Sequence, residues 1–136
     1  MTVIVCLDTK GGMTFNNRRQ SRDSRVTEDV KRICDGKRLL ISPFSEKMLA
    51  TSGIETTVLE DPLGEAKAGD TVFVENLPVA PYIDRTERII VYNWNRSYPA
   101  DRHFDVNMGA CGFKLQSTRE FVGSSHEKIT REDYTK

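Results

Sequence analysis

The sequence predicts a single-domain α/β fold, in which a central, mostly parallel sheet carries helices on both faces. Short apolar runs typical of buried strands alternate with amphipathic or capped helical segments, as in parallel strands joined by helices. The last third of the chain has short apolar pieces between polar loops, so antiparallel C-terminal strands are expected at one edge of the sheet. Because 38% of the 136 residues are hydrophobic, one packed core is expected, and residues 1–136 are assigned to one domain.

The first elements are a strand and a helix. Residues 3–7 form a continuous apolar run with β-branched side chains, which is typical of a strand buried on both faces. Apolar residues then recur at helical spacing, so a helix is expected over residues 24–34. N-cap candidates lie between Ser21 and Ser24, and Gly36 is the expected C-cap. The glycine- and arginine-rich segment between these elements, residues 11–25, is interpreted as a solvated loop.

A second strand is expected at residues 38–42, followed by a short helix with Pro43 in its first turn and Gly53 beyond its end. A third strand is expected within residues 56–61, and a helical or irregular crossover follows it. Four further segments are expected to form strands: residues 71–75, 87–95, 112–116 and 127–136. Within the strongest of these, Tyr92 and Trp94 share one face and are interpreted as core.

Charge and cysteine content exclude several classes of function. The 20 Lys and Arg residues balance 20 Asp and Glu residues, so no overall field draws the chain to nucleic acid or to a membrane. The opening apolar run is too short for a signal peptide or a bilayer span, so a cytoplasmic location is expected. Three dispersed cysteines and two isolated histidines argue against a disulfide framework and against a metal site.

Four stretches together carry a resemblance to a known family. They are "VIVCLDTKGGMTFN", "DVKRICDGKRLLIS", "ERIIVYNWNRSYPADRHFD" and "FKLQSTREFVG", in that order along most of the chain. In their order and spacing the chain resembles a dihydrofolate reductase, as a short, divergent bacterial member of that family. The resemblance implies a trimmed version of the reductase fold.

The resemblance also implies which functional motifs are missing. Gly12 and Met13 fit the start of the family's active-site loop, but "RRQS" replaces its Leu-Pro-Trp. The position of the family's catalytic carboxylate falls on Val26. The nearest acids are Glu28 and Asp29, the weak catalytic candidates, and an acid two positions along a helix points about 200° away.

The family's cofactor motifs are altered as well. Its Gly-Arg-x-Thr phosphate motif corresponds here to Ser42-Pro43-Phe44-Ser45, which lacks the arginine and one amide donor. Its Gly-Gly corresponds to Glu75 and Asn76, and a carboxylate at that position repels a pyrophosphate. Most of the catalytic and cofactor motifs are therefore absent together, which favours a protein without reductase activity.

The preferred hypothesis is a dihydrofolate reductase-like protein that is not an enzyme, needs no cofactor, and holds a small molecule or partner in a remnant cleft. This cleft is expected to be lined by Cys6, Gly12, Met13, Val26, Ser42, Ser45, Glu75 and Asn76. One alternative is an NADPH-dependent oxidoreductase acting on a pterin-like or other small substrate. It uses NADP as cofactor and Glu28 or Asp29 as proton donor.

A second alternative is RNA binding or processing through an arginine-rich segment, although the neutral net charge disfavours nucleic acid. The candidate anion or nucleic-acid contacts are Arg18, Arg19, Arg22 and Arg25. The partner is otherwise unknown, no membrane partner is expected, and a monomer and a homodimer both fit the sequence. His126, beside Ser124 and Ser125, suggests a nucleophile–base pair, but no third group is identifiable, so a cap or polar turn is preferred.

Overall fold

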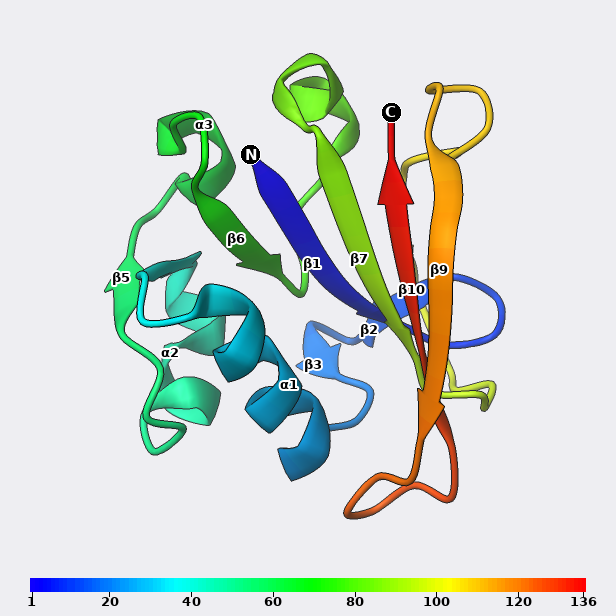
Figure 1. Ribbon diagram of the computed structural model, residues 1–136. Coiled ribbons are helices and arrows are strands. Elements are labelled where there is room, and N and C mark those ends of the chain that lie inside the picture. The colour runs from blue at the N-terminus through cyan, green and yellow to red at the C-terminus, as the bar shows by residue number, and fades with distance from the viewer.

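A computed structural model describes residues 1–136 and contains a seven-stranded sheet with the strand order β5-β4-β6-β1-β7-β10-β9 (Figure 1). The parallel strands are β1 (Thr2–Leu7), β4 (Leu39–Ile41), β5 (Thr56–Val58), β6 (Thr71–Val74) and β7 (Arg88–Asn93). The antiparallel edge strands are β9 (Lys114–Phe121) and β10 (Ile129–Thr135). The predicted α/β fold, with its antiparallel C-terminal edge, is confirmed.

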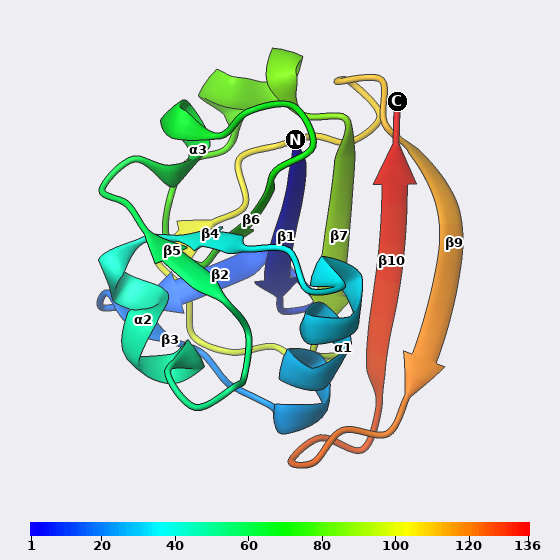
Figure 2. The same ribbon diagram turned by 60° about the vertical axis from the view of Figure 1, so that its left-hand side comes forward.

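The two longer α-helices lie on one face of the sheet (Figures 1 and 2). They are α1 (Ser24–Cys34) and α2 (Pro43–Leu49), while the short elements are α3 (Pro62–Glu65) and the 3-10 helix η1 (Ala80–Arg85). Helix α1 has the predicted bounds, but its C-cap is Asp35 in the left-handed conformation, not Gly36. Aspartate tolerates that conformation, and the Asp35 amide donates to the Lys31 carbonyl. None of the helices combines the length and the apolar character needed to cross a bilayer.

Alternating side chains of the central strands supply two apolar cores, one on each face of the sheet. The α1 and α2 side contains Ile4, Val26, Val30, Leu49, Phe73, Ile90, Tyr92 and Trp94. The other side contains Val3, Val5, Met13, Leu63, Val72, Ile89, Val91 and Phe113. Because Leu63 belongs to α3, helices contribute to both faces. Tyr92 and Trp94 are buried on one face as predicted.

The segment expected to be a solvated loop is partly a small sheet. Strands β2 (Gly12–Phe15), β3 (Arg18–Arg19) and β8 (Arg102–His103) form it in the order β3-β2-β8. The turn residues Asn16 and Asn17 have φ values of 50° and 57°, which two-residue hairpin turns require. The hairpin turns the chain back, so that Arg19 reaches the carboxyl end of β6.

Candidate functional site

Four of the predicted cleft residues, Cys6, Met13, Val26 and Glu75, line voids where β1 and β6 end beside α1 and α2, but little space remains between them. Cys6, Val26 and Glu75 line one inner cavity together with Phe73 and Trp94, and its volume is only about 30 Å³. Such a space holds a water molecule or two, whereas small-molecule sites typically measure about 300–1,000 Å³. Met13, together with Cys6 and Glu75, lines a neighbouring void of about 10 Å³.

A closed ion-pair cluster fills the end of this cleft. The Arg19 guanidinium donates to both carboxylate oxygens of Glu75, at 2.5 and 2.8 Å, and Ser45 Oγ donates to Glu75 Oε1 at 2.6 Å. Arg19 also donates to the Phe44 carbonyl, and its guanidinium lies 5.1 Å from the centre of the Phe44 ring. We call Arg19, Ser45 and Glu75 the Arg19 clasp. Ser45 and Glu75 lie in the two segments that the resemblance assigned to phosphate contact, and here they bond to each other. Because Glu75 is a carboxylate and Arg19 is already paired with it, the residues present do not fit a pyrophosphate.

The remaining predicted cleft residues have structural roles or lie apart. Ser42 is the N-cap of α2 without a side-chain hydrogen bond. A Cβ on Gly12 would lie 2.6 Å from an Asp8 carboxylate oxygen, so a glycine fits best there. The Asn76 side-chain oxygen is buried without a partner. Burial, reinforced by the negative charge of Glu75, raises the pKa of the Cys6 thiol, which therefore stays protonated.

The Arg19 clasp is expected to contribute measurably to stability. In a Glu75→Gln variant the Arg19 charge loses its carboxylate while it remains partly buried, so the free energy of unfolding should fall by about 2 kcal/mol. Urea denaturation measures this change. The matched control is Glu120→Gln, because Glu120 pairs with Lys128 at 3.6 Å with both side chains more than half exposed. A change below about 0.5 kcal/mol is expected there, and equal losses in the two variants would contradict the assignment.

The two acidic candidates on α1 have different surroundings. Glu28 is exposed, whereas the Asp29 carboxylate is buried and accepts from the Tyr92 hydroxyl at 2.6 Å, from Arg131 at 3.0 Å, and from Arg119. Burial by itself raises the pKa of Asp29, but the hydrogen bonds from Tyr92 and Arg119 outweigh it and hold the pKa below its ordinary value. Asp29 is therefore ionised and fully paired, which does not suit a proton donor.

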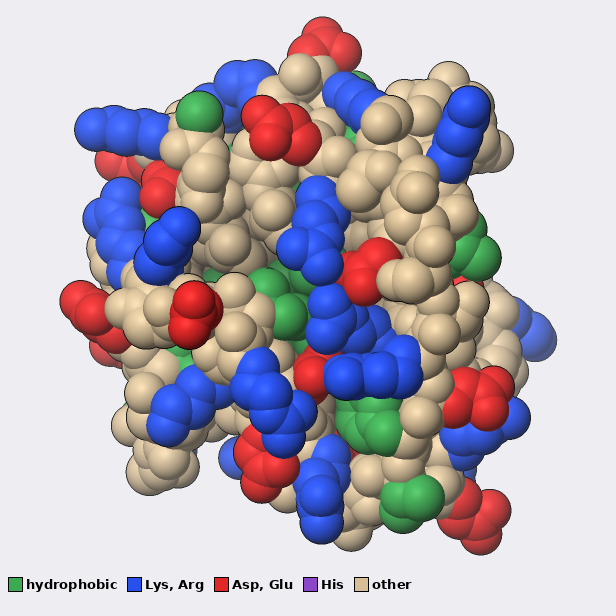
Figure 3. All heavy atoms as spheres, in the orientation of Figure 1, with side chains coloured by type: hydrophobic (Ala, Val, Ile, Leu, Met, Phe, Trp, Pro, Cys, Tyr) green, Lys and Arg blue, Asp and Glu red, His purple; other side chains and the backbone are tan.

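Basic side chains gather on the face where α1 and β9 lie, with a few carboxylates among them (Figure 3). The four arginines of the predicted anion surface do not act together. Arg19 is committed to Glu75, whereas Arg18, Arg22 and Arg25 are exposed. Arg18 and Arg22 line an open hollow of about 410 Å³ beside the hairpin, which we call the arginine basin. Its other lining residues are Asn17, Arg19, Ser21 and Phe44.

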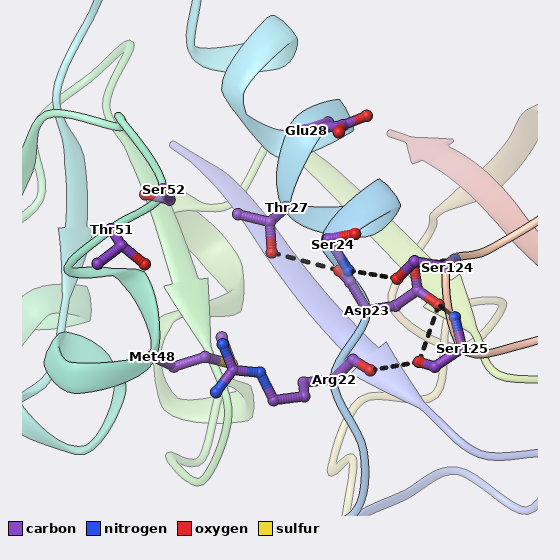
Figure 4. Close-up of a pocket in the computed structure, with 10 residues that line it drawn as sticks. All are labelled: Arg22, Asp23, Ser24, Thr27, Glu28, Met48, Thr51, Ser52, Ser124 and Ser125. Carbon is purple, nitrogen blue, oxygen red and sulfur yellow. Dashed lines mark hydrogen bonds between the residues drawn. The ribbon is translucent and has the colours of Figure 1, made fainter.

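A larger hollow of about 480 Å³ lies between the start of α1, the end of α2 and the β9–β10 connection (Figure 4). We call it the α1 basin. Six hydroxyl side chains line it, with Arg22, Asp23, Glu28 and Met48: Ser24, Thr27, Thr51, Ser52, Ser124 and Ser125. The Arg22 side chain extends toward Met48. The sequence did not indicate this basin, because its walls come from three distant segments.

Beside the α1 basin lies a buried chain of hydrogen bonds that the sequence analysis missed. His126 Nδ1 is 2.8 Å from Asp23 Oδ2, and Ser21 Oγ is 2.8 Å from His126 Nε2. The Asp23 side chain is 0% exposed and that of His126 only 3%. Of the cap and the polar turn expected here, the structure has a turn, because residues 124–127 form a run of bends and no helix; Ser124 and Ser125 donate to Asp23 through their amides. From the sequence, no third group was identifiable beside His126 and a neighbouring serine. In the structure that group is Asp23, the N-cap of α1.

Asp23 organises this chain electrostatically. Burial by itself raises its pKa, but the amides of Ser124 and Ser125, with His126, outweigh burial and hold the pKa of Asp23 well below its ordinary value. The carboxylate is therefore ionised and accepts only, so His126 Nδ1 carries the hydrogen that bonds to it. In the neutral ring Nε2 is then the acceptor for the Ser21 hydroxyl. The Trp94 ring stacks on the imidazole at a centroid distance of 4.6 Å and fixes its plane.

No cluster of three or more His, Cys, Asp and Glu side chains is arranged to hold a metal ion. All three cysteines, Cys6, Cys34 and Cys111, are free thiols.

Comparison with known proteins identifies the fold. No family model and no curated protein matches the sequence. Among solved structures, the dihydrofolate reductase of Enterococcus faecalis, complexed with NADP(H) and RAB-propyl, is similar with a TM-score of 0.69 and 12% sequence identity. The similarity covers 98% of this chain and 94% of that one. The chain therefore has a dihydrofolate reductase-like fold, as the sequence resemblance implied.

Proposed function

We propose that this chain is a dihydrofolate reductase-like protein that does not perform NADPH-dependent reduction and binds a small polar molecule in the α1 basin. The Arg19 clasp carries the first part of the proposal. In the similar enterococcal enzyme this fold holds NADP(H), whereas here Arg19 and Ser45 both donate to the Glu75 carboxylate. A dinucleotide would have to break these bonds and then meet the negative charge of Glu75.

The positions of the acidic side chains on α1 support the same proposal. Val26 is buried at the position that the resemblance gives to a catalytic carboxylate. Asp29 is held by Tyr92 and three arginines, and Glu28 points to the exposed side of α1. Asp23, the N-cap of α1, does line the inner cavity, where the proton donor of a divergent reductase would have to act, but its carboxylate is held by His126 and by the amides of Ser124 and Ser125.

The α1 basin supplies the volume that the inner cavity lacks. Arg22 offers a cation and Glu28 an anion toward opposite ends of the basin (Figure 4), and the hydroxyls of Ser24 and Thr51 make no hydrogen bond within the chain. These groups suit a small zwitterion, such as a free amino acid, whose carboxylate pairs with Arg22 and whose ammonium pairs with Glu28. The surrounding hydroxyls can satisfy its remaining polar atoms.

Titration of isotopically labelled protein with L-glutamate, L-serine and glucose tests the ligand site. We expect saturable shifts in the amide resonances of Ser24, Thr27 and Ser124 with an amino acid but not with glucose. Arg22→Ala should weaken the affinity about tenfold, equivalent to one lost charge-assisted hydrogen bond. Arg96→Ala is the control, because Arg96 is exposed and lies outside the basin. Failure of both amino acids to cause saturable shifts would contradict the proposal.

A further inference from the structure

We propose that Ser21, His126 and Asp23 form a catalytic triad that hydrolyses small anionic carboxylic esters. The three side chains stand in the order nucleophile, base and orienting carboxylate. Both links, Ser21 Oγ to His126 Nε2 and His126 Nδ1 to Asp23 Oδ2, measure 2.8 Å. Triads are recognised by this geometry and not by sequence position, and here 105 residues separate Ser21 from its base.

The surroundings of His126 favour a base over a mere structural bridge. In the neutral imidazole, the hydrogen bond to Asp23 favours the tautomer with the proton on Nδ1, which leaves Nε2 as the acceptor that faces the Ser21 hydroxyl. Trp94 holds the ring from one side at an interplanar angle of 21°, and the Tyr98 hydroxyl lies 3.4 Å from Nε2. A base that is buried, oriented and bonded to a hydroxyl meets the requirements for activating a serine.

Ser21 is also accessible to a substrate. It lies in the wall of the open arginine basin, outside both helix and strand, and is only partly buried. The amide N–H groups of Ser21 and Arg22 make no hydrogen bond within the chain. These groups, on the nucleophile and on the next residue, are free to stabilise an oxyanion.

The same basin indicates the class of substrate. Arg18 and Arg22 are exposed cations, and the Phe44 ring provides an apolar surface beside them. An ester that carries a carboxylate or phosphate group therefore fits better than a neutral or cationic one. The basin volume of about 410 Å³ matches a small molecule.

The reaction has two balanced steps. In the first, Ser21 Oγ forms a bond to the ester carbonyl carbon and its proton moves to His126 Nε2. The bond from that carbon to the leaving oxygen then breaks, and His126 returns the proton to the alcohol that departs. In the second, water attacks the acyl group, His126 takes a proton from the water, and the acyl–Ser21 bond breaks as Oγ is reprotonated. The products are a carboxylic acid and an alcohol.

The test uses the full chain with mono-4-nitrophenyl glutarate, and with 4-nitrophenyl acetate as the neutral comparison. We expect hydrolysis above the buffer rate, with a higher kcat/KM for the glutarate ester. Ser21→Ala should reduce kcat by about 1,000-fold or to the buffer rate. Arg18→Ala should raise KM for the glutarate ester alone, because its side chain lies in the basin and makes no ion pair. Ser117→Ala, in the exposed strand β9, is the unchanged control.

A fluorophosphonate probe gives a second, independent readout on the wild-type chain. The Ser21 oxygen should displace fluoride from phosphorus, and mass spectrometry should locate the label on Ser21. Labelling should disappear in His126→Gln, provided that its circular dichroism spectrum is unchanged. The proposal is overturned if the wild-type chain neither hydrolyses the esters above the buffer rate nor takes the label, or if hydrolysis survives Ser21→Ala.

Discussion

Replacing Asp23 with alanine is expected to lower the free energy of unfolding by about 4 kcal/mol. The carboxylate caps α1 through the Arg25 amide and accepts from the amides of Ser124 and Ser125 and from His126. Its loss removes a helix cap, which is typically worth about 1 kcal/mol, and takes the acceptor from the buried His126 and from the partly buried amides of Ser124 and Ser125, at about 1–3 kcal/mol for the buried donor and less for the amides. Urea denaturation followed by circular dichroism measures the change.

A second N-cap provides the control for the Asp23 result. Asp61 caps the short helix α3 by accepting from the Gly64 amide, in exposed surroundings. Asp61→Ala should therefore cost about 1 kcal/mol, as an ordinary cap does. If Asp23→Ala costs no more than Asp61→Ala, then Asp23 does not hold the β9–β10 connection to α1.

The second large effect is expected at Asp29. Asp29→Asn should lower the free energy of unfolding by about 3 kcal/mol at neutral pH, because Arg131 and Arg119 lose a buried carboxylate partner. The folded-state pKa of Asp29 lies below its ordinary value of 3.8, so its contribution is fully present above that value. The contribution is lost as the pH falls through the folded-state pKa. The difference in the free energy of unfolding between wild type and Asp29→Asn should therefore narrow below about pH 4.

Denaturation curves between pH 7 and pH 2.5 check this prediction, with Asp35→Asn as control. Asp35 is exposed, and asparagine tolerates its left-handed conformation equally well, so a change below about 0.5 kcal/mol is expected. If the difference in the free energy of unfolding between wild type and Asp29→Asn widened toward acid pH, the Asp29 carboxylate would not be ionised and paired in the folded chain.

The sequence predicted the main sheet because its strands carry strong local signals. β1 and β7 are apolar on both faces, and the alternation of Ile89, Ile90, Val91 and Tyr92 assigned each side chain to the correct core. The hairpin of β2 and β3 was missed because its strands are short and polar. Only Asn16 and Asn17 signalled it, as a pair of residues that accept positive φ.

The site was harder to predict because its contacts are distant in the sequence. Glu75 was recognised as unsuitable beside a pyrophosphate, but its pairing with Arg19 spans 56 residues and has no local signature. Asp23 and His126 are 103 residues apart, and a helix cap and a polar turn account for each of them separately. Only the fold brings the two groups together beside Trp94.

We propose that the Arg19 clasp excludes NADP(H), with which the similar enterococcal structure is complexed. Isothermal titration calorimetry with NADPH, together with a spectrophotometric assay of dihydrofolate reduction, tests it most directly. We expect no saturable heat at millimolar NADPH and no oxidation of NADPH above the rate without protein, because Arg19 and Ser45 remain bonded to Glu75. Saturable NADPH binding accompanied by dihydrofolate-dependent oxidation would contradict the account.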